Sequence, residues 1–113
     1  MGEYIIYFNQ QWVGDHDEAW IRSRGPLAEA VVEQMKAAGV YVFAAGVEED
    51  VDAAFSADAT GGELRFTNGP YRRTAESLGG FAVVRVADDK AARLWAGRLA
   101  EACGWPQEVR RVM

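Results

Sequence analysis

The residues of this chain that could carry out acid–base chemistry are few and scattered. His16 is the only histidine in 113 residues, and it lies in the polar stretch GDHDE. Histidine is the side chain that most often acts as a general base near neutral pH. No second histidine is available to share a metal ion with it, so no metal site is expected. The simpler interpretation of His16 is a solvated loop residue.

Carboxylates supply the other candidates for acid–base work. Glu76 lies in the stretch TNGPYRRTAESLGGF, residues 67–81, and Glu48, Glu49 and Asp50 follow an expected strand. A carboxylate pair can act as acid and base when it is buried. Three consecutive acidic residues at a turn are more commonly solvated. Glu76 and His16 are therefore the catalytic candidates in this sequence.

The stretch around Glu76 could instead bind a ligand, or simply connect two strands. Asn68-Gly69 favours a tight turn, and Pro70 fixes the exit from it. The pair Gly79-Gly80 at the start of a strand indicates a bulge or a close backbone approach. Glycine-rich backbone beside Arg72 and Arg73 could also hold an anion. Neither a P-loop lysine nor a GxGxxG motif is present, however, so phosphate binding is not favoured.

Aromatic side chains are the third group of interest, since the chain has four tryptophans. Trp95 falls on the apolar stripe of an expected helix and is assigned to the core. Trp12 and Trp20 lie in a polar segment, where a large ring must pack in a core or dimer contact or line a cavity. The expected ligand-binding residues are Trp12, Trp20, Asn68, Tyr71 and Arg72.

Composition limits the classes of protein that these residues can serve. Half of the chain is apolar and 26% is charged, which suits a single domain over residues 1–113. A net charge of −5 repels phosphate backbones, so no nucleic-acid partner is expected. No apolar run approaches the roughly 18 residues of a membrane span, and the start lacks a signal peptide, so a cytoplasmic location is expected. Cys103 is the only cysteine and is expected to be a buried thiol, and no cofactor is implied.

The elements that must position these residues can be traced by their periodicity and end signals. A helix is expected over residues 26–38 and another from Asp88 or Asp89 to Gly104. A short helical piece from Asp15 or Asp17 to Arg24 is expected to be interrupted by Gly25-Pro26, because proline opposes a helix interior. Strands are expected at Tyr4–Phe8, Tyr41–Val47, Val51–Ser56, Glu63–Thr67, Gly80–Val86 and Glu108–Met113.

The order β-α-β-β-β-β-α-β predicts an α+β fold. It fits a ferredoxin-like plait of the dimeric α/β-barrel type, with a mostly antiparallel sheet, an added hairpin and two helices on one face. The first strand is apolar on both sides, which predicts a central position. The other face of the sheet stays apolar, so we expect a homodimer that buries it. A ligand pocket is expected between the first helix, the polar segment and the TNGPY turn.

The segment NGPYRRTAESLGGFAVVRV resembles the signature of the YCII-related proteins, in the branch called DGPF-domain proteins. The hallmark Asp-Gly-Pro-Phe turn is represented by Asn68 to Tyr71, and Leu78 to Phe81 match the Leu-Gly-Gly and the aromatic that follow it. Asn68 keeps the turn but replaces a titratable carboxylate. The closing VRRVM is similar to the branch's usual ending, with Arg111 in place of proline. The resemblance implies a ferredoxin-like fold and a dimer whose sheets face one another.

The resemblance also bears on function. Some members of the family look like small enzymes with a histidine–aspartate pair, one of them linked to dehydrochlorination of an aromatic. The matching places here are Gly25 and Ala37 or Ala38, so this pair is absent. The sequence therefore predicts a dimeric small-molecule-binding protein. The alternatives are an accessory or regulatory protein, for example beside an extracytoplasmic-function sigma factor, and a small lyase.

Overall fold

The computed structural model describes residues 1–113 and contains six strands, two α-helices and two short 3₁₀ turns. The strands and α-helices follow one another in the predicted order. The helices are α1 (Glu18–Ala37) and α2 (Asp89–Cys103), and the 3₁₀ turns are η1 (Gln10–Val13) and η2 (Val51–Ala53). The strands are β1 (Gly2–Asn9), β2 (Tyr41–Gly46), β3 (Phe55–Asp58), β4 (Arg65–Asn68), β5 (Leu78–Val86) and β6 (Glu108–Arg111).

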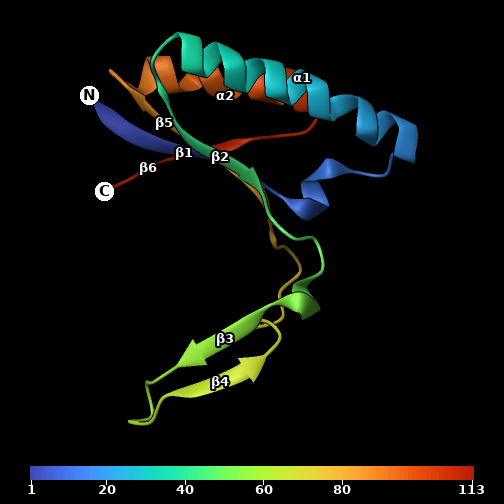
Figure 1. The fold of residues 1–113 in the computed structure, drawn as a ribbon, viewed down its shortest axis with the longest axis vertical. Helices are drawn as coiled ribbons and strands as arrows, with labels where there is room; N and C mark the ends of the chain where they lie inside the picture. Colours follow the sequence, from blue (N-terminus) through green and yellow to red (C-terminus); the bar gives the residue numbers. More distant parts are fainter.

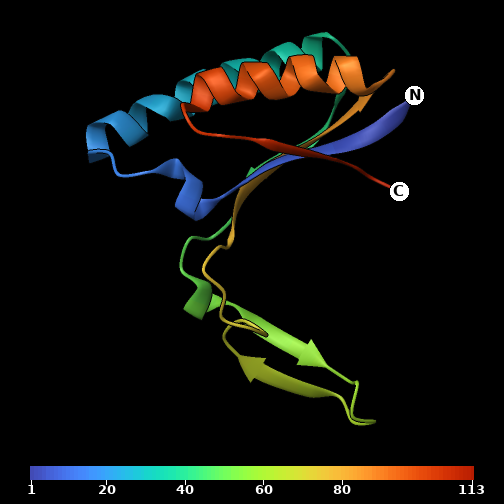
Figure 2. The same cartoon turned by 180° about the vertical axis from the view of Figure 1, so that it is seen from behind.

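Four of the strands form one antiparallel sheet in the order β2-β5-β1-β6. Both helices lie on the same face of this sheet, and the termini lie near one another at one end (Figure 1 and Figure 2). The predicted α+β class and ferredoxin-like arrangement are confirmed, with a sheet that stays open and does not close into a barrel. β1 is an inner strand, as its two apolar faces predicted.

The core lies between the helices and the sheet. Side chains of a strand alternate between its two faces, and the alternate residues Tyr4 and Ile6 of β1 and Ala82, Val84 and Val86 of β5 are buried. Burial of each large aliphatic side chain stabilises the fold by about 1.5–3 kcal/mol. The connected core consists of Tyr4, Ile6, Val31, Met35, Ala82, Val84, Val86, Ala92, Trp95 and Leu99. The predicted core position of Trp95 and burial of Cys103 are both confirmed.

Helix α1 differs from its prediction, because it runs without interruption through Gly25-Pro26. The predicted break there is wrong. Pro26 cannot donate a hydrogen bond to the carbonyl of Arg22, but both residues lie on the exposed side of the helix, where water can replace the donor. Gly25 has no β-carbon to collide with the proline ring, which removes the usual penalty on the residue before proline.

The ends of both helices follow their local signals. The carboxylate of Asp17 accepts a hydrogen bond from the backbone N–H of Trp20 at 2.8 Å, and that of Asp88 accepts one from Ala91 at 2.9 Å. Both are helix N-caps, so the structure selects Asp17 over Asp15 and Asp88 over Asp89, the alternatives that the sequence left open. Gly104 adopts a left-handed conformation with φ of 86° and ends α2.

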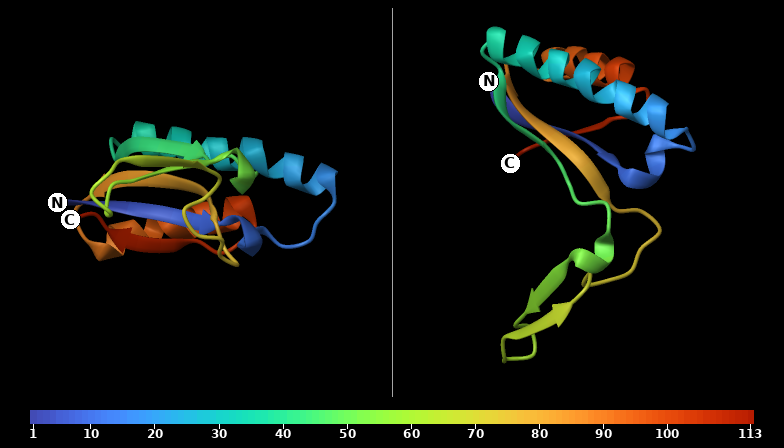
Figure 3. Two further views of the ribbon diagram at one scale, coloured as in Figure 1. Left: turned by 90° about the horizontal axis from the view of Figure 1, so that it is seen from below. Right: turned by 45° about the vertical axis from the view of Figure 1, so that its right-hand side comes forward.

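The strands β3 and β4 form a separate two-stranded sheet rather than extending the main one. Figure 3 shows this hairpin standing clear of the main sheet, on the side away from the helices. The prediction of a strand at Val51–Ser56 is wrong in position: the side chain of Asp50 accepts from the N–H of Asp52 and starts the turn η2, so β3 begins only at Phe55. β6 likewise ends at Arg111 instead of Met113.

Candidate functional site

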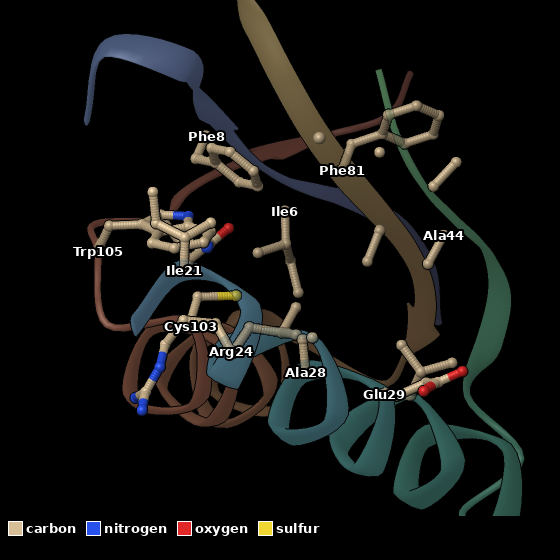
Figure 4. Close-up of a pocket in the computed structure, with 18 residues that line it drawn as sticks. Ile6, Phe8, Ile21, Arg24, Ala28, Glu29, Ala44, Phe81, Cys103 and Trp105 are labelled. Atoms are coloured by element: carbon tan, nitrogen blue, oxygen red, sulfur yellow. The ribbon is translucent and has the colours of Figure 1, made fainter. Parts of the chain in front are cut away.

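A cavity of about 450 Å³, open to solvent, lies between α1 and the helix-facing side of the sheet (Figure 4). Small side chains create the space: Ala28 on α1, Ala44 on β2 and Ala82 on β5 all line it. Protein interiors are normally packed with few voids larger than a water molecule. Three alanines on three facing elements therefore leave a hollow that larger side chains would have filled.

One aromatic wall of the cavity depends on the double glycine of β5. Phe8 on β1 pairs with Gly80, and the register of the two strands shifts by one residue at the next pair. A β-carbon on Gly80 would lie 2.9 Å from the ring of Phe8, and one on Gly79 would lie 2.6 Å from it. The sequence predicted a bulge or a close backbone approach at Gly79-Gly80, and the structure has both.

A row of aromatic rings continues from this wall toward the surface. The rings of Phe8 and Trp105 have centroids 5.1 Å apart, and those of Trp105 and Trp20 are 6.2 Å apart. His16 stacks on Trp20 at 3.6 Å with an angle of 19° between the rings. Phe8 and Trp105 line the cavity, whereas Trp20 and His16 lie behind Trp105. The fold thus brings two of the sequence candidates together, one ring away from the cavity.

The cavity wall is mainly apolar, and its polar members are few. Arg24, Glu29 and Cys103 are the ionisable residues among its lining, and none of them is a histidine or an aspartate. Burial raises the pKa of the Cys103 thiol, although the charge of Arg24 opposes the shift. A neutral thiol is a poor nucleophile. The indole N–H of Trp105 is buried and has no hydrogen-bond acceptor.

Two other sequence candidates meet outside the cavity. The indole N–H of Trp12 donates to the carboxylate of Glu76, and the ring of Trp12 lies 6.1 Å from that of Tyr7. Beside them, the backbone N–H of Ser77 donates to the side-chain oxygen of Gln11 at 2.9 Å. These contacts fasten η1 to the segment before β5. The pair is exposed to solvent, so the carboxylate of Glu76 has an anchoring contact rather than a buried catalytic setting.

The remaining candidates lie on the hairpin and the connection that follows it. Asn68 is the last residue of β4 and pairs with Phe55. The guanidinium of Arg72 lies 5.2 Å from the ring centre of Tyr71, and Arg73 forms an ion pair with Asp52. None of the seven residues proposed from sequence as catalytic or ligand-binding lines the cavity. Of the predicted pocket walls, only the first helix is shared with it.

Sequence reasoning missed Phe8, Trp105 and the three alanines as cavity residues. One signal was available in each strand, because YVFAAG and GGFA place runs of small residues in apolar segments. Such runs do not indicate whether side chains of a facing helix fill the space above the strands. The small side chain of Ala28 on α1 leaves that space empty.

Other kinds of site are not built into this arrangement. No group of three or more His, Cys, Asp or Glu side chains is placed to hold a metal ion. Neither α-helix has the length and apolar composition that crossing a membrane would require.

These features define a small α+β protein with an open antiparallel sheet and an apolar cavity beneath its first helix. The YCII-related domain family matches residues 16–105, and the chain therefore belongs to this family. The family predicted from the NGPY and LGGF segments is confirmed. A comparison with curated proteins found no match.

Proposed function

We propose that this YCII-related protein binds a small molecule in the cavity between α1 and the sheet. The cavity itself is the observation that carries the proposal. Its volume of about 450 Å³ falls within the range of about 300–1,000 Å³ that is typical of ligand pockets. A domain of 113 residues has little core to spare, so space of this size under a helix favours a binding function.

Binding is favoured over catalysis by what the wall lacks. Gly25 lines the cavity, and it stands where the resemblance places the histidine of the family's catalytic pair. A residue without a side chain at this place leaves the cavity without that base. Glu29 is the only carboxylate in the lining, and its residue is exposed. Acid–base catalysis of the lyase type is therefore the less favoured alternative.

Filling the cavity tests the proposal. Ala28→Leu adds three carbons to the middle of the wall, whereas Ala30→Leu adds the same atoms to an exposed position of α1 outside the lining. We expect ethylbenzene, a neutral apolar probe, to bind the unaltered protein and Ala30→Leu with equal affinity in a fluorescence or NMR titration. Ala28→Leu should weaken this binding at least tenfold. Absence of binding to all three proteins would refute the proposal.

We further propose that the protein works as a homodimer joined through the uncovered face of the sheet. Phe43, Phe81 and Val83 share this face by their pairing, and the rings of Phe43 and Phe81 lie 6.0 Å apart. Phe43 is 52% exposed. An exposed apolar face on a small domain is usually buried against a second copy.

Light scattering at micromolar protein should give a mass of twice the 12.4 kDa of one chain. Phe43→Glu should convert this species to a monomer. Leu94→Glu is the matched control, because Leu94 is 51% exposed but lies on α2, away from the uncovered face. A monomeric mass for the unaltered protein would overturn the dimer.

A protein partner is the second candidate function, and the hairpin is the observation that favours it. Phe55 and Phe66 lie on the same face of the β3–β4 hairpin and are 76% and 70% exposed. The hairpin stands apart from the main sheet (Figure 1), and none of its residues lines the cavity. If it docks a partner such as an extracytoplasmic-function sigma factor, the double change Phe55→Ser and Phe66→Ser should abolish binding to the purified factor. Ethylbenzene binding should remain unchanged.

A further inference from the structure

We propose that the ligand of the cavity is an uncharged, compact, mainly apolar molecule with one hydrogen-bond acceptor, such as an aromatic ketone. This inference rests on the proposed binding function and adds the chemical class of the ligand. It follows from three properties of the wall: where its charges point, which donor it leaves without a partner, and which surfaces enclose the ligand.

The charged groups of the lining do not point into the interior of the cavity. The guanidinium of Arg24 lies 4.7 Å from the ring centre of Trp20 and donates to the hydroxyl of Ser23 at 3.0 Å. Figure 4 shows this guanidinium turned away from Ile6 and Phe8, so that only the stem of Arg24 borders the cavity. The same view places Glu29 at the opposite end of the cavity.

The third ionisable group does not supply a charge either. Burial raises the pKa of the Cys103 thiol and keeps it protonated near neutral pH. An ion placed between Ile6, Phe8 and Leu99 would lose its hydration without gaining a partner of opposite charge. Burying an unpaired charge is strongly unfavourable, so the cavity selects against anions and cations alike.

One polar group in the wall lacks a partner within the protein. The Nε1 atom of Trp105 is the only buried side-chain nitrogen or oxygen without a hydrogen bond. An indole N–H can only donate, so its missing partner is an acceptor. Because Nε1 has almost no accessible surface, the ring of Trp105 must turn slightly for a ligand oxygen at the Phe8–Trp105 end to supply that acceptor. Gln107, the other neutral polar residue of the lining, offers an amide and no charge.

The rest of the wall suits a compact ring. Phe8 and Trp105 present two aromatic rings whose centroids are 5.1 Å apart at one end, and Val32, Leu99 and Ile6 provide aliphatic surface. Aromatic groups favour edge-to-face or offset contact with other rings. An aryl group with a short carbonyl substituent satisfies both the apolar wall and the single donor.

Three probes of similar size test the ligand class: acetophenone, ethylbenzene and benzoate. Acetophenone and ethylbenzene differ only in a carbonyl in place of a methylene, and benzoate adds a charge. We expect acetophenone to bind about three- to tenfold tighter than ethylbenzene and at least tenfold tighter than benzoate. Its binding should also shift the indole N–H resonance of Trp105 in ¹H–¹⁵N spectra, more than that of Trp12.

The variant Trp105→Phe keeps an aromatic wall and removes the donor. It should remove the preference for the carbonyl, so that acetophenone and ethylbenzene bind to this variant with equal affinity. If this variant does not fold, the shift of the Trp105 indole resonance in the unaltered protein still tests whether acetophenone binds beside the donor. Equal affinity for acetophenone and ethylbenzene, an unmoved Trp105 resonance, or benzoate binding as tight as acetophenone overturns the ligand class while the binding function stands. Failure of all three probes to bind overturns both.

Discussion

The ring of Phe8 lies against the bare backbone of Gly80, the residue opposite it on the neighbouring strand. A β-carbon on Gly80 would approach the ring to 2.9 Å, which is closer than carbon atoms pack in proteins. Phe8 in turn contacts Trp105. The glycine in a family-signature segment thus sets the position of both aromatic walls of the cavity, 5.1 Å apart by their ring centres.

Gly80→Ala should therefore destabilise the protein and disturb ligand binding together. The added methyl group must push the ring of Phe8 toward the cavity, because the other neighbour is the backbone carbonyl of Ala45 at 3.4 Å. Overpacking of this kind costs about 1–3 kcal/mol. Urea unfolding should show this loss, and ethylbenzene affinity should fall as the cavity narrows.

Gly97→Ala is the matched control for Gly80→Ala. Gly97 lies on the exposed side of α2, and a β-carbon there would meet nothing within 4 Å. Alanine is favoured over glycine in a helix interior by about 0.5–1 kcal/mol. The same substitution should thus stabilise at one site and destabilise at the other. Equal effects at both positions would show that the contact between Phe8 and Gly80 is not tight.

The sequence predicted those parts of the fold that depend on local signals. Asp17, Asp88 and Gly104 mark helix ends through contacts within a few residues. Gly104 was predicted, and each of the two aspartates was one of two neighbouring candidates. The path of α1 through Pro26 was not predictable in this way, because it depends on which side of the helix faces water. That side is fixed only when Val31 and Met35 pack against the sheet.

The candidate site was predicted less well for a related reason. Polar and aromatic residues such as His16 and Trp12 attract attention because they carry chemistry. The cavity is instead defined by the small side chains of Ala28, Ala44 and Ala82, which are far apart in sequence. The space that these small side chains leave exists only once α1, β2 and β5 have packed together, so it could not be predicted from any one segment.

Asn68→Asp should be tolerated, because the turn after β4 makes no demand on this side chain. Asn68 is exposed at the end of the hairpin, and the strained position is its neighbour Gly69, with φ of 95°. The melting temperature should change by less than about 2 °C, within the range of ordinary surface substitutions. Gly69→Ala should lower stability by about 1 kcal/mol or more, since residues other than glycine avoid this conformation. A large fall in the melting temperature of Asn68→Asp would show that the side chain of Asn68 makes a contact that stabilises the fold.

His16→Ala should leave ligand binding unchanged. His16 stacks on the outer side of Trp20 and is separated from the cavity by Trp105. Its loss should alter tryptophan fluorescence, because an aromatic neighbour 3.6 Å from Trp20 is removed, while the affinity for ethylbenzene stays within twofold. Loss of ethylbenzene binding would show that His16 contributes to the binding site, which would contradict its position outside the cavity lining.

Acid should weaken the attachment of β6 to α2, through Asp89. The hydroxyl of Tyr4 donates to this carboxylate at 2.6 Å, and the guanidinium of Arg111 lies 3.1 Å from the same oxygen. The hydrogen bond from Tyr4, followed by that from Arg111, lowers the pKa of Asp89 below its ordinary value of 3.8. A lowered pKa in the folded state contributes stability above the unfolded pKa, and this contribution is lost as the pH falls through the folded pKa.

The urea midpoint should accordingly fall as the pH is lowered below about 4, near the ordinary pKa of an aspartate. Tyr4→Phe removes the main cause of the shift, so the midpoint should be lower at pH 7 and should depend less on pH below 4. Tyr71→Phe is the control, because Tyr71 is exposed and lies in the connection between β4 and β5, whereas Asp89 begins α2. It should keep the pH dependence of the unaltered protein. An identical acid response in Tyr4→Phe would mean that the hydroxyl of Tyr4 does not hold the carboxylate of Asp89 in its charged form.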